Sequence, residues 1–287
     1  MSENTKLNIA VIGAGGKMGM RVSDNLDKTS HAAHYVENSE AGQARVTEAG
    51  RKLTSLEDAV ADADVVVLAV PDLALGPVSA DVVPLMKSGS AVLTLDPAAA
   101  YVGLLTTRDD VVQAVAHPCH PSVFLERTTK EEWADTFGGI AAPQDVVAAV
   151  EEGTSREMQD IVETTVRVIY GPVIDVHWVT IKQLAQLEPT LVETIGCMIG
   201  AFLNDSLHEA VHTMGVPEPA ARAMLFGHVQ IALANGLRGD HPFSDACLIA
   251  MDYGRKNIIR DDWKNIFSDE KLHATLAEML KLESADF

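Results

Sequence analysis

Four glycines occur within seven residues near the start of the chain, in the stretch Gly13-Ala14-Gly15-Gly16-Lys17-Met18-Gly19. The stretch lies between an apolar run, Leu7 to Ile12, and a helical pattern that begins at Lys17. Glycines let a backbone turn sharply and approach a diphosphate, whose charge then rests on free N–H groups at a helix start. Met18 takes a place that G-x-G-x-x-G gives to glycine, so the spacing is G-x-x-G-x-x-G. We expect all seven residues to bind the pyrophosphate of a dinucleotide. The alternative is that the stretch is only a structural turn, and we favour the dinucleotide site.

An acid follows the next short apolar run, Ala32 to Val36. Glu37 lies 24 residues after Gly13, close to the spacing of about 20 at which such sites place the acid that binds ribose. A carboxylate accepts hydrogen bonds from ribose hydroxyls and repels a 2′-phosphate, and residues 38–40 include no arginine to hold that phosphate. The sequence therefore predicts NAD rather than NADP. If Glu37 instead caps a helix over Glu40–Ala49, the choice of cofactor stays open.

Three more polar stretches follow apolar runs and so belong at the ends of strands. In doubly wound sheets, ligands bind beyond the carboxyl ends of the strands. Helix capping or turn formation is at least as common a role for a single aspartate in such a place. We expect the first stretch to lie beside the cofactor, and it comprises Val70, Pro71 and Asp72. We expect the others to face the substrate through Asp96, His117 and His120.

The cluster His117-Pro118-Cys119-His120-Pro121 offers three possible metal ligands within four residues. Two prolines stiffen it, and no fourth ligand stands nearby at metal-site spacing, so we expect no metal there. A histidine that donates to a substrate carboxylate or hydroxyl is the favoured role, and a plain turn is the alternative. We choose His120 for that role, although spacing does not exclude His117.

Short apolar runs alternate with helical patterns through the first 178 residues. This alternation is typical of an α/β Rossmann domain with a doubly wound, mostly parallel sheet. A further strand is expected over Asp145–Val150 and a helix over Ser155–Val168. After Trp178 helical patterns take over, and we expect an all-α domain over residues 179–287. Its helices are predicted over Thr190–Met214, Pro219–Ala234 and Phe243–Ile259, with a last one from Ser268.

Composition limits the kinds of partner. The 287 residues are 47% hydrophobic, enough for a large core, and carry 22 basic against 41 acidic side chains, a net charge of −19. That charge argues against nucleic acid and anionic membranes as partners. Three separated cysteines suit a reducing compartment, and the sequence shows neither a signal peptide nor an apolar run long enough to span a bilayer. We expect a cytoplasmic protein that acts on a small molecule.

Four stretches carry a resemblance to a known family: Ala10–Met20, Ala116–Phe124, Gln183–Thr194 and Phe243–Ala250. Through them nearly the whole chain resembles the 6-phosphogluconate dehydrogenase and β-hydroxyacid dehydrogenase superfamily, and most closely its D-apionate oxidoisomerase group. The resemblance implies oxidation of a hydroxyl on a small sugar acid or hydroxy acid, with NAD accepting hydride and the resulting keto acid rearranging. It also implies a homodimer formed through the helical domains.

The resemblance also suggests catalytic residues after Trp178. Lys182 and Gln186 match a lysine and an amide that the better-known members carry on an interdomain helix, whereas Pro189 stands where some carry a glutamate. Glu193 would lie about 16 Å along a straight helix from Lys182, too far to share one small carbon centre. If Pro189 begins a new helix, Glu188 sits at its mouth, and we favour Glu188 as the proton carrier.

Lys182 is a candidate for the base that removes the hydroxyl proton, whereas Glu188 would carry the proton during the rearrangement. It can act as a base only if burial lowers its pKa, and otherwise it is a surface charge. A histidine is the alternative base, with His120 as our choice. Gln186 and Glu193 are expected to contact the substrate.

Two rival functions remain. One is a reductase of an imine or unsaturated acid, because the glycine stretch also resembles that of dihydrodipicolinate reductases, whose second domain is a sheet. The other is a non-catalytic NAD sensor, which would bind the nucleotide without turning over any sugar acid.

Overall fold

The computed structural model describes residues 6–282. The chain forms two compact units, and each is considered by itself. One contains the chain up to Glu188 together with the C-terminal stretch from His273, and the other is Pro189–Leu272.

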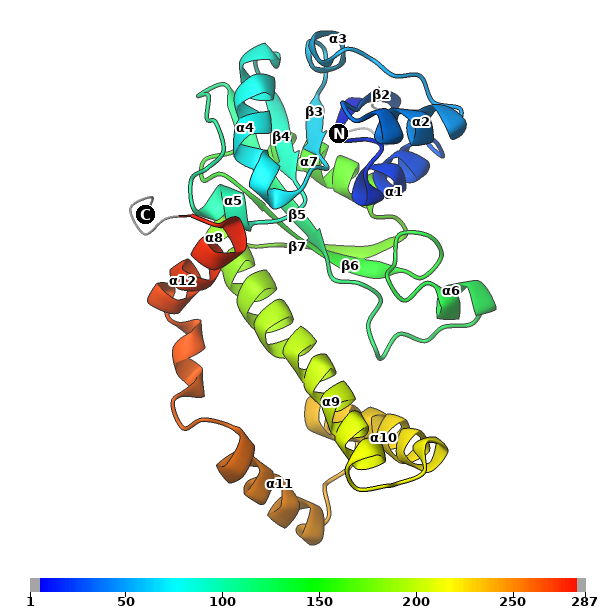
Figure 1. Cartoon of the computed structure of the whole chain (residues 1–287). Helices are drawn as coiled ribbons and strands as arrows, with labels where there is room; N and C mark the ends of the chain where they lie inside the picture. The colour runs from blue at the N-terminus through cyan, green and yellow to red at the C-terminus, as the bar shows by residue number, and fades with distance from the viewer. Residues whose placement is uncertain (1–5, 283–287) are drawn as a thin grey trace. The chain divides into compact units, whose positions relative to one another are not determined.

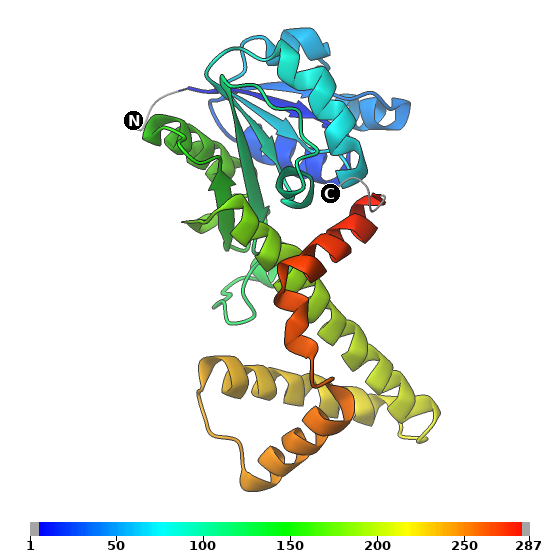
Figure 2. The ribbon, with the colours of Figure 1, turned by 90° about the vertical axis from the view of Figure 1, so that its left-hand side faces the viewer.

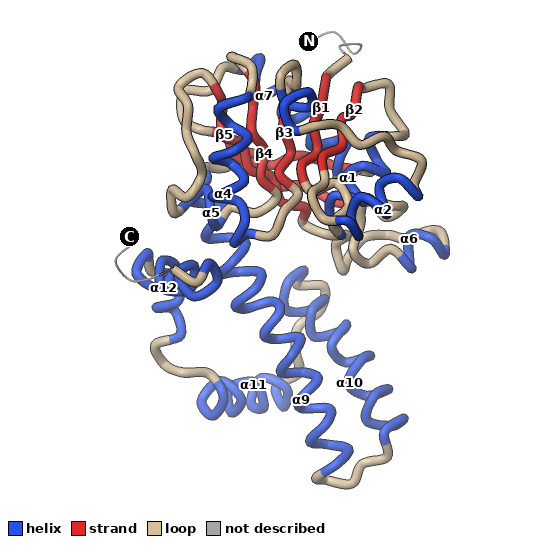
Figure 3. The backbone as a smooth tube through the Cα atoms, turned by 45° about the horizontal axis from the view of Figure 1, so that its top comes forward, coloured by secondary structure: helices blue, strands red, loops and turns tan. Residues whose placement is uncertain are grey.

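The first unit is built on a seven-stranded sheet in the order β2-β1-β3-β4-β5-β6-β7 (Figures 1 and 3). The strands are β1 (Asn8–Ile12), β2 (Ala32–Val36), β3 (Val65–Leu68), β4 (Ser90–Thr94), β5 (Val111–Pro118), β6 (Gln144–Val150) and β7 (Val173–Trp178). All neighbouring strands pair in parallel except β5 and β6, which are antiparallel. The predicted doubly wound, mostly parallel sheet is confirmed.

Helices cover both faces of this sheet, which explains why the inner strands are apolar without alternation. Ile9 and Val11 of β1 face a core shared with helices α1 (Lys17–Leu26) and α7 (Arg156–Ile169). Ala10 and Ile12, the intervening residues, face a second core shared with α4 (Asp72–Val82). Figure 2 shows α7 and α4 on opposite sides of the strands.

The remaining helices of this unit are short, apart from α2 and the C-terminal helix. They are α2 (Glu40–Glu48), α3 (Leu56–Val60), α5 (Ala98–Tyr101), α6 (Lys130–Ala134), α8 (Ile181–Ala185) and the part of α12 (Asp269–Leu280) that begins at His273. A 3₁₀ turn over Val83–Leu85 follows α4.

The backbone after the sheet is helical without a break from Ile181 to His212. It passes from α8 into a π-helix over Gln186–Cys197 and then into α9 (Met198–His212). The expectation that Pro189 begins a new helix is therefore wrong, because Pro189 lies inside the π-helix. Proline disrupts the hydrogen-bond ladder of an α-helix and clashes with the carbonyl four residues before it. The wider π turn, with its different ladder, accommodates the ring.

The second unit is wholly helical. After α9 it contains α10 (Glu218–Leu233), a π turn over Ala234–Arg238, α11 (Asp245–Ile258) and a 3₁₀ helix over Trp263–Phe267. The predicted α10 and α11 are confirmed to within two residues at each end. Within residues 6–282, none of the helices combines the length and the apolar character that crossing a bilayer requires.

Candidate active site

The glycine stretch forms the turn between β1 and α1, and its backbone is packed too closely for side chains. Gly13 has a φ of +80°, and a Cβ there would lie 2.7 Å from the Ala69 carbonyl oxygen and 2.8 Å from Val70 Cγ1. A Cβ on Gly19 would come within 2.8 Å of the Ala14 Cα. Gly16 is the N-cap of α1, so the first N–H groups of that helix begin here. This cradle fits a dinucleotide diphosphate.

Glu37 lies against this turn. Its Oε2 accepts the Gly15 N–H at 2.9 Å, and its Oε1 accepts the Ser39 N–H at 2.9 Å. The alternative in which Glu37 caps α2 is not what the structure shows, because Ser39 is the N-cap and its Oγ accepts the Gly42 N–H. Burial alone would raise the pKa of Glu37, but hydrogen bonds from Ser39, Gly15 and Asn38 hold it below its ordinary value. The carboxylate is therefore ionised at neutral pH.

Val70, Pro71 and Asp72 follow β3, at the same edge of the sheet. Val70 lies directly against Gly13, and Pro71 is the N-cap of α4. Asp72 stands in the first turn of that helix, where burial raises its pKa. The residues expected to bind the cofactor after β1 and after β3 thus lie next to each other.

A second polar group gathers at the ends of β4 and β5. One oxygen or nitrogen from each of Asp96, His117 and Glu188 lies within 4.8 Å of the others. Glu188, in the first turn of the π-helix, is only 5% exposed, and the other two side chains are half-buried. Asp96 is fixed by a turn in which its Oδ1 accepts the Ala98 N–H at 2.8 Å. We call these three residues the Asp–His–Glu cluster.

The chemical state of His117 follows from its surroundings. Its Nδ1 lies 3.1 Å from the Leu95 carbonyl oxygen, which can only accept a hydrogen bond. Nδ1 therefore carries the proton, and Nε2 keeps its lone pair. Burial lowers the pKa of His117 to about 4, and the neighbouring His120 adds to this effect, so the ring is neutral at pH 7.

His120 lies between the cluster and the start of α1. Its ring centroid is 6.3 Å from that of His117, and its Nδ1 is 2.8 Å from the Phe137 carbonyl oxygen. The Phe137 ring in turn lies beneath Lys17, whose Nζ is 5.1 Å from the ring centroid, and beneath Arg21 at 4.6 Å. The loop that carries His120 is thereby attached to the helix of the glycine stretch.

The candidates that follow Trp178 differ in burial. Lys182 is exposed on α8, so the burial that a catalytic lysine needs is not found in this chain. Gln186 is half-buried, and Glu193 is exposed in the second compact unit. Of these residues, Glu188 is a member of the Asp–His–Glu cluster.

Sequence reasoning missed one buried group near the cluster. Tyr170 is 3% exposed, and its hydroxyl donates to the Ala116 carbonyl oxygen at 2.8 Å. Burial raises the pKa of Tyr170, and the charge of Asp96 raises it further, so the phenol stays protonated. A lone tyrosine at the end of α7 gives no sequence signal that could have identified it.

Asp135 holds the loop that carries Phe137 through hydrogen bonds to the backbone. A substitution of Asp135 tests how much these bonds stabilise the protein. Its Oδ2 accepts three backbone N–H groups, from Ile140, Ala141 and Ala142, at 2.8 to 3.1 Å. We expect Asp135→Asn to lower the free energy of unfolding by about 1–3 kcal/mol at pH 7, because the bonds lose their charged acceptor. Urea unfolding measures this, with the exposed Asp109→Asn as control.

The same substitution has a pH signature. Burial would raise the pKa of Asp135, but the three N–H groups and Arg21 lower it below its ordinary value. A carboxyl whose folded pKa is lowered stabilises the fold above about pH 4 and loses that effect as the pH falls through the folded value. The difference between wild type and Asp135→Asn should therefore shrink towards pH 3. An equal difference at pH 7 and pH 3 would contradict this explanation.

Comparison with known proteins agrees with this geometry. The family described as acetohydroxy acid isomeroreductase, NADPH-binding domain, matches residues 4–169, and phosphogluconate dehydrogenase (decarboxylating) C-term matches residues 125–280. Fold and site thus define an oxidoreductase that uses a nicotinamide dinucleotide.

Relatives narrow this class. D-apionate oxidoisomerase from Pectobacterium atrosepticum is 57% identical over 278 residues, 97% of each chain, and that from Blautia hydrogenotrophica is 42% identical over 96% of this chain and 97% of its own. This chain belongs to the D-apionate oxidoisomerase family. A solved semialdehyde dehydrogenase NAD-binding protein from Cupriavidus necator, in complex with calcium and NAD, is 39% identical and superposes with a TM-score of 0.92 over 96% of this chain and all of its own. The predicted superfamily is confirmed.

Proposed function

We propose that this enzyme oxidises a CH–OH group of the branched sugar acid D-apionate with NAD and then rearranges the keto product. The observation that carries the proposal is the Asp–His–Glu cluster at the sheet edge that also carries the glycine turn. β1, β4 and β5 run parallel, so their carboxyl ends share that edge. The relatives named D-apionate oxidoisomerase support the choice of substrate.

The residues divide between holding the cofactor and handling the substrate. Gly13 to Gly19 would hold the diphosphate and Glu37 the ribose, and bound NAD would supply the hydride acceptor. His120 and Asp96 would orient the substrate's carboxylate and hydroxyls. Glu188 would accept the hydroxyl proton as the carbonyl forms, and the neutral Nε2 of His117 would accept a hydrogen bond from a second hydroxyl. In this way the buried cluster fixes the substrate and moves its proton.

A substrate screen tests this proposal. The enzyme is offered D-apionate and linear aldonic acids with NAD, and turnover is followed by nicotinamide absorbance. We expect turnover on D-apionate. NAD binding with no turnover on any sugar acid would support a sensor instead, and NAD(P)H-dependent reduction of an imine or unsaturated acid would support a reductase.

Cofactor choice gives a separate prediction. The ionised Glu37 should repel a 2′-phosphate, so we expect NAD to bind on the order of a hundredfold tighter than NADP. Glu37→Ser should narrow that preference, whereas Glu40→Gln, at an exposed acid of α2, should preserve it. Titration of both cofactors by fluorescence measures this. Equal affinities in the wild type would remove Glu37 as the selecting residue.

The helical unit supports a second proposal, that two copies of this chain form a dimer through it. Among residues 189–272, all of which the structure describes, the buried hydrophobic side chains are Leu207, Ala221 and Leu272. Many large apolar side chains are instead exposed, among them Met198, Phe202, Phe226, Ile249, Tyr253 and Ile258. So much exposed apolar surface marks an interface, and a second copy offers the same surface in return.

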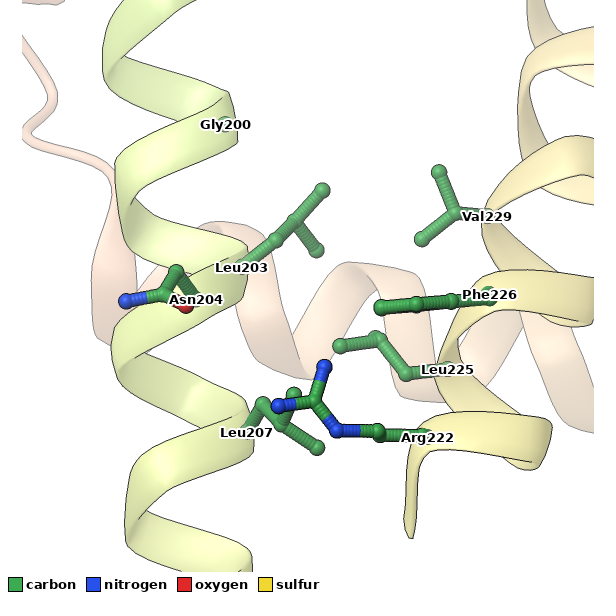
Figure 4. A pocket seen from close by; sticks show the side chains of 8 residues that line it. All are labelled: Gly200, Leu203, Asn204, Leu207, Arg222, Leu225, Phe226 and Val229. Carbon is green, nitrogen blue, oxygen red and sulfur yellow. The ribbon is translucent and has the colours of Figure 1, made fainter. Parts of the chain in front are cut away.

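A groove between α9 and α10 belongs to this apolar surface. Leu203 and Leu207 of α9 and Leu225 and Phe226 of α10 point into the space between the helices (Figure 4). Among the described residues, Arg222 is the one charged residue that lines it. The groove therefore suits an apolar side chain of the partner copy.

Light scattering after gel filtration tests the dimer. We expect the wild type to have twice the chain mass, and Ile249→Asp, at a side chain 73% exposed, to shift it towards the monomer. Ile174→Asp, at a 53% exposed position on β7, is the matched control and should leave the mass unchanged. A monomeric wild type would rule the dimer out.

We propose that the enzyme works in the cytoplasm on a small molecule. The thiols of Cys119, Cys197 and Cys247 are all free, and a reducing compartment keeps thiols in that state. The net charge of −19 disfavours nucleic acid and anionic membranes as partners.

A further inference from the structure

We propose that the Asp–His–Glu cluster binds a divalent cation, with one ligand atom from each of Asp96, His117 and Glu188. The three atoms lie within 4.8 Å of one another. Ligands of a cation with bonds of about 2.0–2.4 Å stand roughly 3 to 4.8 Å apart, so one ion can contact all three with little movement. Sequence spacing predicted no metal at residues 117–121, and it does not reveal this set of ligands because Asp96, His117 and Glu188 lie far apart in the chain.

The donor set suits a cation of intermediate hardness. Two carboxylates and one imidazole are the ligands that Mn²⁺ and Zn²⁺ accept. The Nδ1 of His117 donates to the Leu95 carbonyl at 3.1 Å, which leaves Nε2 for the ion. Metal-binding histidines almost always have such a second hydrogen bond, because it fixes the tautomer and the ring orientation.

Burial and charge support the same conclusion. Glu188 is 5% exposed, and Asp96 is half-buried beside it. Two carboxylates that lie close together in such a place repel each other. A divalent cation balances both charges, and the neutral imidazole adds a donor without adding charge.

Three protein ligands leave coordination positions open to oxygen atoms of a substrate. With the ion bound, a substrate hydroxyl would therefore contact the ion in place of His117 Nε2. A cation there would lower the pKa of a bound hydroxyl and polarise the carbonyl that forms from it. One oxygen of Glu188 suffices as a ligand, so the other can still accept a proton. Only this catalytic consequence rests on the proposed function, because ion binding does not require a sugar acid.

Another histidine–carboxylate pair provides a matched control. His177 Nε2 lies 3.3 Å from Asp145 Oδ1, and both side chains are exposed. Among the described residues this pair belongs to no group of three potential ligands. Asp145→Asn therefore removes a carboxylate beside a histidine without touching the proposed site.

The experiment measures ion binding with NAD and sugar acids both absent. The full chain is treated with chelator and titrated with Mn²⁺ and with Zn²⁺ by calorimetry, and Mn²⁺ is also followed by electron paramagnetic resonance. We expect one site per chain. Asp96→Asn, His117→Gln and Glu188→Gln should each weaken binding by at least about tenfold, whereas Asp145→Asn should not. Thermal melting of each chelator-treated variant shows which ones remain folded.

The outcomes separate this proposal from the proposed function. Failure of both ions to bind, or binding that every folded variant retains in full, overturns the cation site. In the first case the two carboxylates are held by the protein without an ion, and turnover of D-apionate could still be observed. Stoichiometric binding that the three substitutions weaken supports the site even if no sugar acid is turned over.

Discussion

Gly13→Ala is expected to weaken NAD binding by at least about a hundredfold, which corresponds to about 2.7 kcal/mol. Two effects combine. The φ of +80° at Gly13 costs an L-residue about 1–2 kcal/mol. The added Cβ would also stand 2.7 Å from the Ala69 carbonyl oxygen, so the turn must move away from the end of β3. The diphosphate would then lose the N–H groups that the turn aligns.

Gly50→Ala separates these two effects. Gly50 has a φ of +78°, but a Cβ there meets no atom within 4 Å. It should therefore carry the backbone strain without the collision, and NAD affinity should stay at the wild-type value. Calorimetric titration of both variants, with melting curves to check folding, makes the comparison. A folded Gly13→Ala that binds NAD as tightly as Gly50→Ala would show that the turn does not hold the diphosphate.

The strands were predictable where both of their faces are buried. β1 and β3 are apolar at every position from Ile9 to Ile12 and from Val65 to Leu68, because helices cover both sides. β7 was missed for the opposite reason. It is an edge strand in which Asp175 and His177 interrupt the apolar pattern.

The position of a site residue was predictable where the topology of the sheet alone determines it. Asp96 and His117 follow or end strands with parallel neighbours, so both had to reach the same edge of the sheet. Glu188 lies beside them because the chain forms a π-helix after Ala185. The turns of a π-helix are wider than those of an α-helix, so its side chains point in different directions. Sequence spacing cannot show such a change of helix type. Sequence spacing also cannot show whether a side chain is buried. The exposure of Lys182 could therefore be learned only from the structure.

Glu188→Gln is the second substitution for which we expect a large effect, a fall in kcat of about 10²–10⁴-fold. Glutamine has the same shape and fits the same buried position, but it can neither take a proton nor balance the charge of a cation. The glycine turn and Glu37 form contacts of their own, at the β1, β2 and β3 ends of the sheet, so NAD affinity should not change. A loss in kcat with an unchanged dissociation constant for NAD would place Glu188 in the chemical step.

Two further glutamates complete this test. Glu152→Gln, at an exposed position before α7, should leave turnover unchanged and controls for the loss of one charge. Glu193→Gln tests the alternative proton carrier, which is exposed in the second compact unit. If Glu193→Gln abolishes turnover while Glu188→Gln preserves it, the proton is carried from the helical unit and the buried acid beside Asp96 serves only the fold. The opposite result requires the chemistry to occur where Asp96, His117 and Glu188 meet.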